Sequence, residues 1–258
     1  MPMSLRTSVI VPSLNDAEML EQCLTALDRQ THAPDELIVV DNGSTDNTVE
    51  VALRHGARVV TQPRRGIPLA TAAGFNAASY ELLLRLDADS VPPADWVARV
   101  VAAFEAAPGL DALSGPGRFY GRNAVIHWIA THCYLDLYPA ILGRLFAHDV
   151  LFGSNLALRA SIWPTLRQRA HVDRADVHDD LDLTINLEPG MGVRFDRSLV
   201  VGVSARPFDT WRGLGRRVRM ALVTLALNGS EQNYLDRRRE WVASRLADEE
   251  PGASYTSA

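Results

Sequence analysis

Short apolar runs alternate with amphipathic segments over the first 110 residues of the chain. The runs are rich in Val, Ile and Leu, as in strands buried on both faces, and they cover residues 7–12, 36–41, 57–62 and 80–86. Between them, apolar residues recur at helical spacing, at about residues 17–29, 47–55, 67–79 and 93–109. This alternation predicts an α/β fold with a mostly parallel sheet flanked by helices on both faces. The first strand is expected to end at Pro12, whose nitrogen cannot donate to a ladder.

The second half of the chain is less regular. Residues 124–145 mix aromatic and apolar side chains with charged ones and with His127 and His132, so they could form a core helix pair or a membrane-surface segment. Residues 153–159 predict a turn that enters a strand, and residues 178–187 predict a helix. Residues 211–227 join four arginines to an apolar run. This segment could be a core helix with a solvated basic start, or it could bind anionic lipid headgroups or a phosphate.

Composition excludes several classes of protein. A hydrophobic fraction of 47% in 258 residues is enough for a sizeable core, and the formal charge of −5 argues against a nucleic-acid partner. Two cysteines, Cys23 and Cys133, define no disulfide framework. The N-terminus shows no leader pattern, and no run reaches the roughly 18 apolar residues of a membrane span. These features favour a cytoplasmic location, with peripheral contact at the inner face of the membrane as an open alternative.

Polar residues follow three of the predicted strands, at Pro12–Asp16, Asp41–Ser44 and Asp87–Asp89. Because ligands of open α/β sheets bind beyond the carboxyl ends of the strands, these segments predict a nucleotide pocket. Asp87 and Asp89 offer the carboxylate oxygens that Mg²⁺ and Mn²⁺ prefer, and such a cation could hold a diphosphate. The chain contains neither Gly-x-Gly-x-x-Gly nor a phosphate-binding Gly-Lys-Ser/Thr loop, so the phosphates would need the metal.

These motifs together resemble the family-2 glycosyltransferases over about residues 7–205. Residues 9–16 are similar to the family's opening strand and its Pro-x-x-Asn-Glu loop, with Asp16 in place of Glu. Residues 39–48 are similar to its second motif, whose leading acid, here Asp41, contacts the donor base. Asp87-Ala88-Asp89 matches the metal-binding Asp-x-Asp.

Two later segments extend the resemblance. Residues 153–159 are similar to an acceptor-side Gly-x-Asn-x-Ala-x-Arg turn. Asp179-Asp180-Leu181-Asp182-Leu183 resembles a Glu-Asp-x-Asp-Leu segment whose second acid serves as general base, and this implies that role for Asp180. Asp180 could instead simply begin a helix, where acids favour the positive end of the dipole. We expect His178 beside it to be a bystander rather than a metal ligand.

The chain also departs from the family. Between Gly66 and Gly74 it has Ala70-Thr71-Ala72, where the family often has Ala-Arg-Asn. The arginine usually offered to the donor is therefore missing, and Arg64 and Arg65 are the candidates to replace it. The Gln-x-x-Arg-Trp signature of polymerising members is absent, which favours transfer of a single sugar.

The resemblance implies a GT-A fold, which is Rossmann-like, in a single domain over residues 1–247. Residues 1–110 would form the nucleotide-sugar-binding half and residues 111–205 the acceptor and catalytic half. Residues 206–247 would form C-terminal helices, and residues 248–258 have the composition of a disordered tail.

The resemblance also implies an inverting enzyme that moves one sugar from a nucleotide-sugar donor, with UDP as the expected nucleotide, to a hydroxyl acceptor. Asp89 and Asp87 would bind Mn²⁺ or Mg²⁺, and Asp180 would take the proton. The expected donor-binding residues are Pro12, Ser13, Asn15, Asp16, Asp41, Arg65 and Asp87. The expected acceptor-side residues are Gly153, Ser154, Asn155 and Asp179. The acceptor, which could be a carbohydrate or a lipid, and the oligomeric state are left unspecified.

Two alternatives differ at identifiable residues. A nucleotidyltransferase should carry a glycine-rich basic loop after the first strand, where this chain has Pro12–Asp16. A polyprenyl-phosphate sugar transferase at the membrane surface is the stronger alternative. Its acceptor phosphate is already ionised, so that reaction needs no general base and no role for Asp180.

Overall fold

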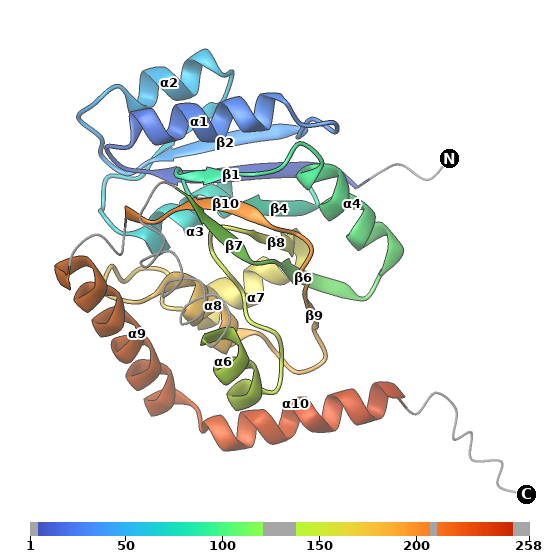
Figure 1. Cartoon of the computed structure of the whole chain (residues 1–258). Coiled ribbons are helices and arrows are strands. Elements are labelled where there is room, and N and C mark those ends of the chain that lie inside the picture. Colours follow the sequence, from blue (N-terminus) through green and yellow to red (C-terminus); the bar gives the residue numbers. More distant parts are fainter. Residues whose placement is uncertain (1–4, 121–137, 207–210, 250–258) are drawn as a thin grey trace, which may run out of the picture.

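A computed structural model describes residues 5–120, 138–206 and 211–249, and its main feature is a seven-stranded sheet in the order β3-β2-β1-β4-β8-β6-β9 (Figure 1). The strands are β1 (Thr7–Ser13), β2 (Glu36–Asp41), β3 (Arg58–Thr61), β4 (Leu82–Arg85), β6 (Leu110–Ser114), β8 (Leu156–Arg159) and β9 (Gly192–Phe195). Neighbours run parallel except at β8, which is antiparallel to β4 and β6. The mostly parallel sheet is therefore confirmed.

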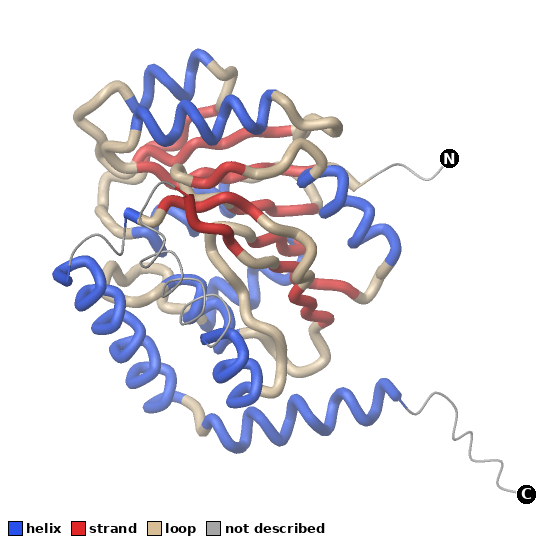
Figure 2. The backbone as a smooth tube through the Cα atoms, viewed as in Figure 1, coloured by secondary structure: helices blue, strands red, loops and turns tan. Residues whose placement is uncertain are grey.

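Helices cover both faces of this sheet (Figure 2). On one face lie α1 (Ala17–Asp28), α2 (Thr48–Arg54) and α4 (Trp96–Ala106), and on the other lie α3 (Ile67–Ala77), α7 (Trp163–Arg169) and α8 (Asp179–Asn186). A short 3₁₀ turn, η2 (Ala160–Ile162), precedes α7. Successive strand residues point to opposite faces, so Val9 and Val11 pack in the first layer and Ile10 in the second. Burial on both sides explains why the strands read as unbroken apolar runs.

Two predicted boundaries are wrong. Strand β1 continues through Pro12, which pairs with Val40, instead of ending there. The last β1–β4 pair joins Ile10 to Arg85, and the Ile10 carbonyl accepts one more hydrogen bond, from the Leu86 amide. Strand β4 has therefore ended before it reaches Pro12, so the missing N–H of Pro12 interrupts no ladder on that side. Helix α4 begins at Trp96 because the carbonyl of Pro93 accepts the Trp96 amide in a preceding turn.

A second, three-stranded sheet was not predicted. It consists of β5 (Ser90–Val91), β10 (Val201–Ser204) and β7 (Gly117–Tyr120), in the order β5-β10-β7. A two-residue strand is too short to carry a hydrophobic period, which is why the sequence pattern does not predict it. This sheet matters for function because it places the chain after Asp89 beside the end of β10.

Three further helices, α6 (Tyr138–Phe146), α9 (Trp211–Glu231) and α10 (Tyr234–Glu249), lie on the side of α8 away from α1 and α2 (Figure 1). Leu142 and Phe146 of α6 are buried against α8, which supports the core interpretation for that part of residues 124–145. His127 and His132 lie outside the described residues. Helix α10 continues through Glu249, past the expected start of the tail at residue 248. Among the described helices, none combines the length and apolar character needed to cross a membrane.

Candidate active site

The site begins at the carboxyl end of β4, where Asp87 and Asp89 follow the buried strand. Asp87 is held on both sides: its Oδ1 accepts a hydrogen bond from Arg85 Nη2 at 2.7 Å, and its Oδ2 accepts one from Ser154 Oγ. Its amide donates to Ser90 Oγ, which closes the turn. The Asp87 carboxylate therefore has a fixed direction and few free lone pairs.

Asp89 has a different environment. Arg206 Nη2 lies 3.7 Å from its Oδ2, and that arginine makes a bidentate pair with Asp16 at 2.7 and 2.9 Å. Burial, and then the neighbouring charge of Asp87, raise the pKa of Asp89 to about 7, although Arg206 acts in the opposite direction. The Asp89 carboxylate thus lacks full charge compensation within the described residues.

A second group of acids comes from the start of α8. Asp180 Oδ2 accepts the Gly153 amide at 3.0 Å, Oδ1 accepts the Leu181 amide at 2.7 Å, and Oδ1 also pairs with His178 Nδ1. Burial alone would raise the pKa of Asp180, but His178, the Gly153 amide and Arg85 together hold it well below its usual range. Burial lowers the pKa of His178, and Asp180 more than offsets this and raises it. His178 is therefore the charge partner of Asp180, a contact that the sequence did not predict.

These groups meet in one cavity of about 250 Å³. Its lining includes Asp87, Asp89, Asp179 and Asp180, together with Arg85, Gly153, Ser154 and His178. Its apolar wall consists of Ile67, Phe119, Phe152, Val203 and Met220. Helix α9, which packs beside α8 in Figure 1, adds Arg216 and Arg217. The cavity thus has an acidic floor and a basic side.

The donor set fits a hard divalent cation. Asp89 supplies a partly exposed carboxylate whose charge is incompletely compensated. The carboxylate of Asp87 is also partly exposed and lies close enough for its charge to raise the pKa of Asp89. His178, Asp179 and Asp180 also have ligand atoms within 4.8 Å of one another. Their oxygens, however, already bind Arg85, Thr71 and backbone amides, so they are less available than those of Asp89. Among these groups, the carboxylate of Asp89 is the most available to a cation, and that of Asp87 lies beside it.

The β1–α1 and β2–α2 loops form a separate, interlocked group. Asn15, with a left-handed φ of 52°, accepts the Thr45 amide on its Oδ1 at 2.7 Å, and Asp41 accepts the Ser44 amide at 3.0 Å. Asn42 donates to the carbonyls of Gln62 and Arg64 and accepts the Gly66 amide. Arg206 joins this group to the cavity, because it contacts both Asp16 and Asp89.

The structure brings some predicted residues into the cavity and leaves others outside it. The cavity lining includes Asp87, Asp89, Gly153, Ser154, Asp179 and Asp180. The donor-side residues Pro12, Ser13, Asn15, Asp16 and Asp41 lie outside it, at the β1 and β2 ends. Arg65 is exposed and also outside, and Arg64 donates to the Asp173 carbonyl at 3.0 Å. Neither arginine lines the cavity.

Asn155 also lies outside the cavity, beneath its floor. Its Oδ1 accepts the Trp96 indole N–H at 2.9 Å, and its amide nitrogen donates to the Leu199 carbonyl at 2.6 Å. With 1% of its surface exposed, the side chain cannot reach an acceptor, so its contribution is to fix the turn that carries Gly153 and Ser154. The prediction that Asn155 contacts the acceptor is therefore not supported by its position.

Sequence reasoning missed two groups, Arg85 in the cavity lining and Arg206 next to Asp89. Arg85 interrupts an apolar strand, and a buried charge requires a buried partner, so its position was a usable signal. Arg206 gave no such signal, because an arginine after a strand is ordinary on a surface. Its contact with Asp89 depends on the unpredicted small sheet.

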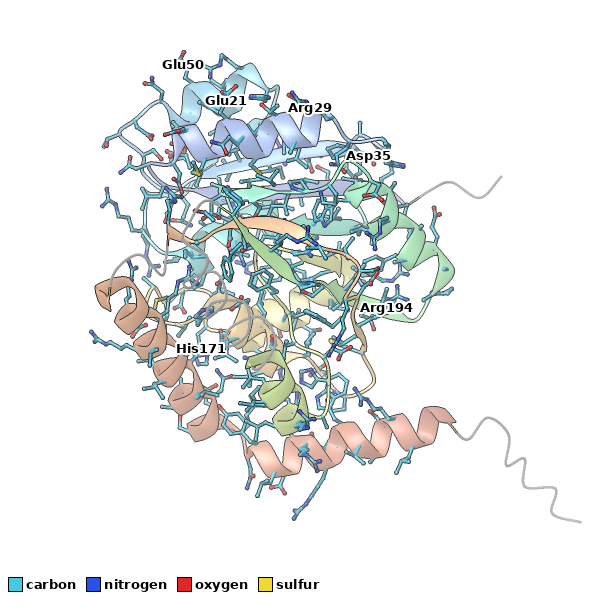
Figure 3. The ribbon with its side chains drawn as sticks, viewed as in Figure 1. Glu21, Arg29, Asp35, Glu50, His171 and Arg194 are labelled. Atoms are coloured by element: carbon cyan, nitrogen blue, oxygen red, sulfur yellow. The ribbon has the colours of Figure 1, made fainter. Side chains whose placement is uncertain are left out.

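Asp182, the third acid of α8, points away from the cavity. It is 2% exposed and accepts hydrogen bonds from the His171 amide at 2.6 Å, from His171 Nδ1 at 2.9 Å and from Asn228 at 2.8 Å. Figure 3 shows His171 beside α9, and its Nε2 lies 3.1 Å from Glu231 at the end of that helix. Asp182 thus fastens α9 to α8.

Solved structures share this fold. The glucosyl-3-phosphoglycerate synthase of Mycobacterium tuberculosis, solved with Mn²⁺, UDP-glucose and phosphoglyceric acid, superposes with a TM-score of 0.66 at 22% identity, over 87% of this chain and 80% of that one. TarS of Staphylococcus aureus gives a TM-score of 0.57 at 16% identity, over 81% of this chain and 38% of that one. At such identities the likeness concerns the fold, and the expected GT-A type is confirmed.

Curated relatives match about half of the chain in length. An uncharacterized glycosyltransferase of M. tuberculosis is 39% identical over 121 residues, which are 47% of this chain and 51% of that protein. A Haloferax volcanii glycosyltransferase is 32% identical over 124 residues, which are 45% of this chain and 40% of that protein. The chain thus spans about half the length of these relatives, or less. The model of glycosyl transferase family 2 matches residues 8–154, and that of glycosyl transferase family group 2 matches residues 82–247. Because the first match alone covers more than half of the 258 residues, the chain belongs to glycosyl transferase family 2.

Proposed function

We propose that this protein transfers one sugar from a UDP-sugar to a hydroxyl group of an acceptor, with inversion at the anomeric carbon and with a divalent cation. The observation that carries the proposal is that Asp89 and Asp180 line one cavity in opposite electrostatic states. The charge of Asp89 is only partly compensated, by Arg206, whereas Asp180 is ionised and held by His178 and a backbone amide. These are the two carboxylates that the reaction needs, one toward the leaving group and one toward the acceptor.

The donor would lie across the ends of β1, β2 and β4. A cavity of about 250 Å³ is smaller than a whole nucleotide sugar needs, so it would hold the sugar and the diphosphate. The base would then extend toward Asp41 and the interlocked loops around Asn15. Arg206 lies between these two parts, next to Asp16 and Asp89, where it can contact the diphosphate.

Transfer would be a single displacement. The acceptor oxygen forms a bond to the anomeric carbon while the bond from that carbon to the diphosphate oxygen breaks, and the nucleoside diphosphate leaves. The hydroxyl proton passes to Asp180, which is ionised at neutral pH. A carboxylate with a low pKa is a weak base, but the acceptor oxygen becomes strongly acidic as its new bond forms, so a weak base suffices. A divalent cation bound by Asp89 would offset the negative charge that develops on the leaving group.

The choice of UDP and Mn²⁺ is supported by a relative in fold. The M. tuberculosis synthase described above was solved with Mn²⁺ and UDP-glucose, and it shares the fold over 87% of this chain. The identity of 22% leaves the sugar and the acceptor of this protein to experiment.

A second candidate acceptor is an ionised phosphate, as in a polyprenyl phosphate. One observation favours it: Arg216 and Arg217 face the cavity from α9. A phosphate acceptor needs no base and gains from two guanidinium groups. The two candidates differ in their requirement for Asp180.

The proposal is tested by the thermal stability of the protein with UDP-, GDP- and dTDP-sugars, with and without Mn²⁺. We expect the midpoint of unfolding to rise with a UDP-sugar only when Mn²⁺ is present. Asp89→Ala should abolish that rise. Glu50→Ala removes the same charge from an exposed ion pair on α2, where Figure 3 labels Glu50, and this residue does not line the cavity, so the variant should retain the rise. A rise that is equal with and without Mn²⁺, or that survives Asp89→Ala, would contradict the metal site.

A further inference from the structure

Arg206 lies directly after β10, and the small sheet brings it to Asp89. In the antiparallel β5–β10 pair Val203 lies opposite Ser90, so the residues after Val203 run back along those before Ser90. The guanidinium of Arg206 makes an ion pair with Asp16, and its Nη2 also lies 3.7 Å from Asp89 Oδ2. One side chain therefore joins the start of α1 to the carboxylate that is most available to a cation.

The contacts of Arg206 with these two acids differ in kind. The pair with Asp16 consists of two hydrogen bonds, of 2.7 and 2.9 Å, in the bidentate geometry that suits a planar guanidinium. The separation of 3.7 Å from Asp89 is too long for a hydrogen bond and leaves charge attraction alone. Arg206 can therefore move away from Asp89 without losing a hydrogen bond, while Asp16 still holds it.

The side chain of Asp16 serves Arg206 instead of helix α1. Asp16 occupies the N-cap position, where an aspartate ordinarily accepts a backbone amide of the first turn, but its carboxylate makes no such bond. Asp46 of the β2–α2 loop accepts the Ala17 amide at 3.1 Å in its place. The Asp16 amide donates to Thr48 Oγ1 at 3.2 Å, which fixes the backbone there. The Asp16 carboxylate is thus held in position for the guanidinium.

We propose that Arg206 and a divalent cation compete for the Asp89 carboxylate, and that Asp16 keeps the displaced guanidinium beside the cation, where it binds the diphosphate. Two positive charges at one carboxylate lower each other's affinity for it, and this coupling is reciprocal. Arg206 therefore weakens the binding of a cation alone and strengthens the binding of a diphosphate. The inference rests on the proposed function for the diphosphate, whereas the competition concerns the cation alone.

The test replaces Arg206 and measures the two affinities separately by calorimetric titration. We expect Arg206→Gln to bind Mn²⁺ alone about three- to tenfold more tightly than the wild type, because Asp89 loses the competing charge. In saturating Mn²⁺ the same variant should bind UDP about tenfold more weakly, because the diphosphate loses a guanidinium. Its affinity for uridine, which carries no phosphate, should not change.

Arg58→Gln is the matched control for these titrations. The Arg58 side chain is 48% exposed, like that of Arg206, and it pairs with Glu36 at 2.7 Å. Arg58 lies at the start of β3 and does not line the cavity. This variant removes the same charge from an ion pair of similar exposure, so it should leave the affinities for Mn²⁺, UDP and uridine unchanged.

A second variant tests the part played by Asp16. Asp16→Asn removes the hydrogen-bonded partner of Arg206, so the guanidinium pairs with Asp89 alone and Mn²⁺ binds more weakly. The loss should be about threefold or more in the wild-type background and clearly smaller in the Arg206→Gln background, where no guanidinium competes. The direct loss of the Asp16 charge would instead weaken Mn²⁺ binding equally in both backgrounds.

Three outcomes would overturn the proposal. They are an affinity of Arg206→Gln for Mn²⁺ that does not exceed the wild-type value, affinities for Mn²⁺ and UDP that change in the same direction, and equal effects of Asp16→Asn in both backgrounds. Arg206→Met takes the place of Arg206→Gln if that variant does not fold. If the wild-type protein binds no UDP, the proposed function fails, while the Mn²⁺ titrations still decide the competition. Absence of Mn²⁺ binding by the wild type and by Arg206→Gln would also overturn it.

Discussion

Two groups of acids face each other across the cavity, and they differ in how their charge is compensated. Asp89, after β4, has a guanidinium 3.7 Å away that is shared with Asp16, and burial raises its pKa to about 7. Asp180, at the start of α8, has His178 and two backbone amides, and its pKa is held well below its usual range. Both side chains are largely buried, so burial alone does not explain the difference.

The difference lies in what the fold supplies around each carboxylate. At Asp180 the chain provides its own positive partner and hydrogen-bond donors, which favour the ionised form. At Asp89 it provides less than one full partner, so an external cation would bind there with a gain in free energy. The charge of Asp180 is therefore compensated within the chain, whereas we expect that of Asp89 to be fully compensated only by a bound cation.

The largest expected change in stability concerns Asp182, the acid of α8 that serves the fold. Asp182→Ala leaves His171 and Asn228 without their buried acceptor, and we expect the free energy of unfolding to fall by about 3 kcal/mol. Urea unfolding measures it. Asp176→Ala removes an exposed acid paired with Arg174 and should change the value by less than about 0.5 kcal/mol. If both substitutions lower the free energy of unfolding equally, the contacts of Asp182 with His171 and Asn228 do not stabilise the packing of α9 on α8.

A smaller effect is expected when His178 is replaced, because Asp180 then loses its charged partner and its pKa shifts upward, toward that of Asp89. His178→Gln takes away the charge that lowers the pKa of Asp180, so that pKa rises and the acid limb of kcat moves to higher pH. Turnover at about pH 7.5 should fall by less than about tenfold, because Asp180 stays mostly ionised there. A pH profile of kcat checks this. An unmoved acid limb would show that the two groups are not coupled during turnover.

The smallest effect concerns His171, the histidine partner of Asp182. Burial lowers its pKa, but Asp182 and Glu231 raise it more, so the net pKa is raised. A raised folded-state pKa stabilises the protein below the unfolded value, about 6.5, and the gain is lost as the pH rises through the folded value. We expect His171→Gln to lower the free energy of unfolding more at about pH 6 than at about pH 9. A cost that does not depend on pH would contradict a charged His171.

Much of the first half of the fold could be predicted because local pattern and structure coincide there. Strands β1, β2 and β4 are apolar runs with buried side chains on both faces, and Asp41, Asp87 and Asp89 lie at or directly after the strand ends. The second half depends on contacts between distant segments. Asp182 lies two residues after Asp180 in the sequence, but the helix turns its side chain away from the cavity and toward His171 and Asn228.

The same reason explains the misplaced predictions within the site. Asn155 lies in a motif beside Gly153, yet its amide is used by Trp96 and Leu199, which are 59 and 44 residues away in sequence. The missing arginine was sought at Arg64 and Arg65 because they are near Gly66 in sequence. Arg85, whose guanidinium contacts Asp179, was missed because the two residues are close only in space.

The most direct test of the account is Asp180→Asn, measured for both turnover and Mn²⁺-dependent UDP binding. The amide keeps the shape of the side chain but cannot accept the proton. We predict that kcat falls by about 10²- to 10⁴-fold while the dissociation constant for UDP changes by less than about threefold. Turnover retained at the wild-type rate would contradict Asp180 as the proton acceptor and would favour an acceptor that is already ionised.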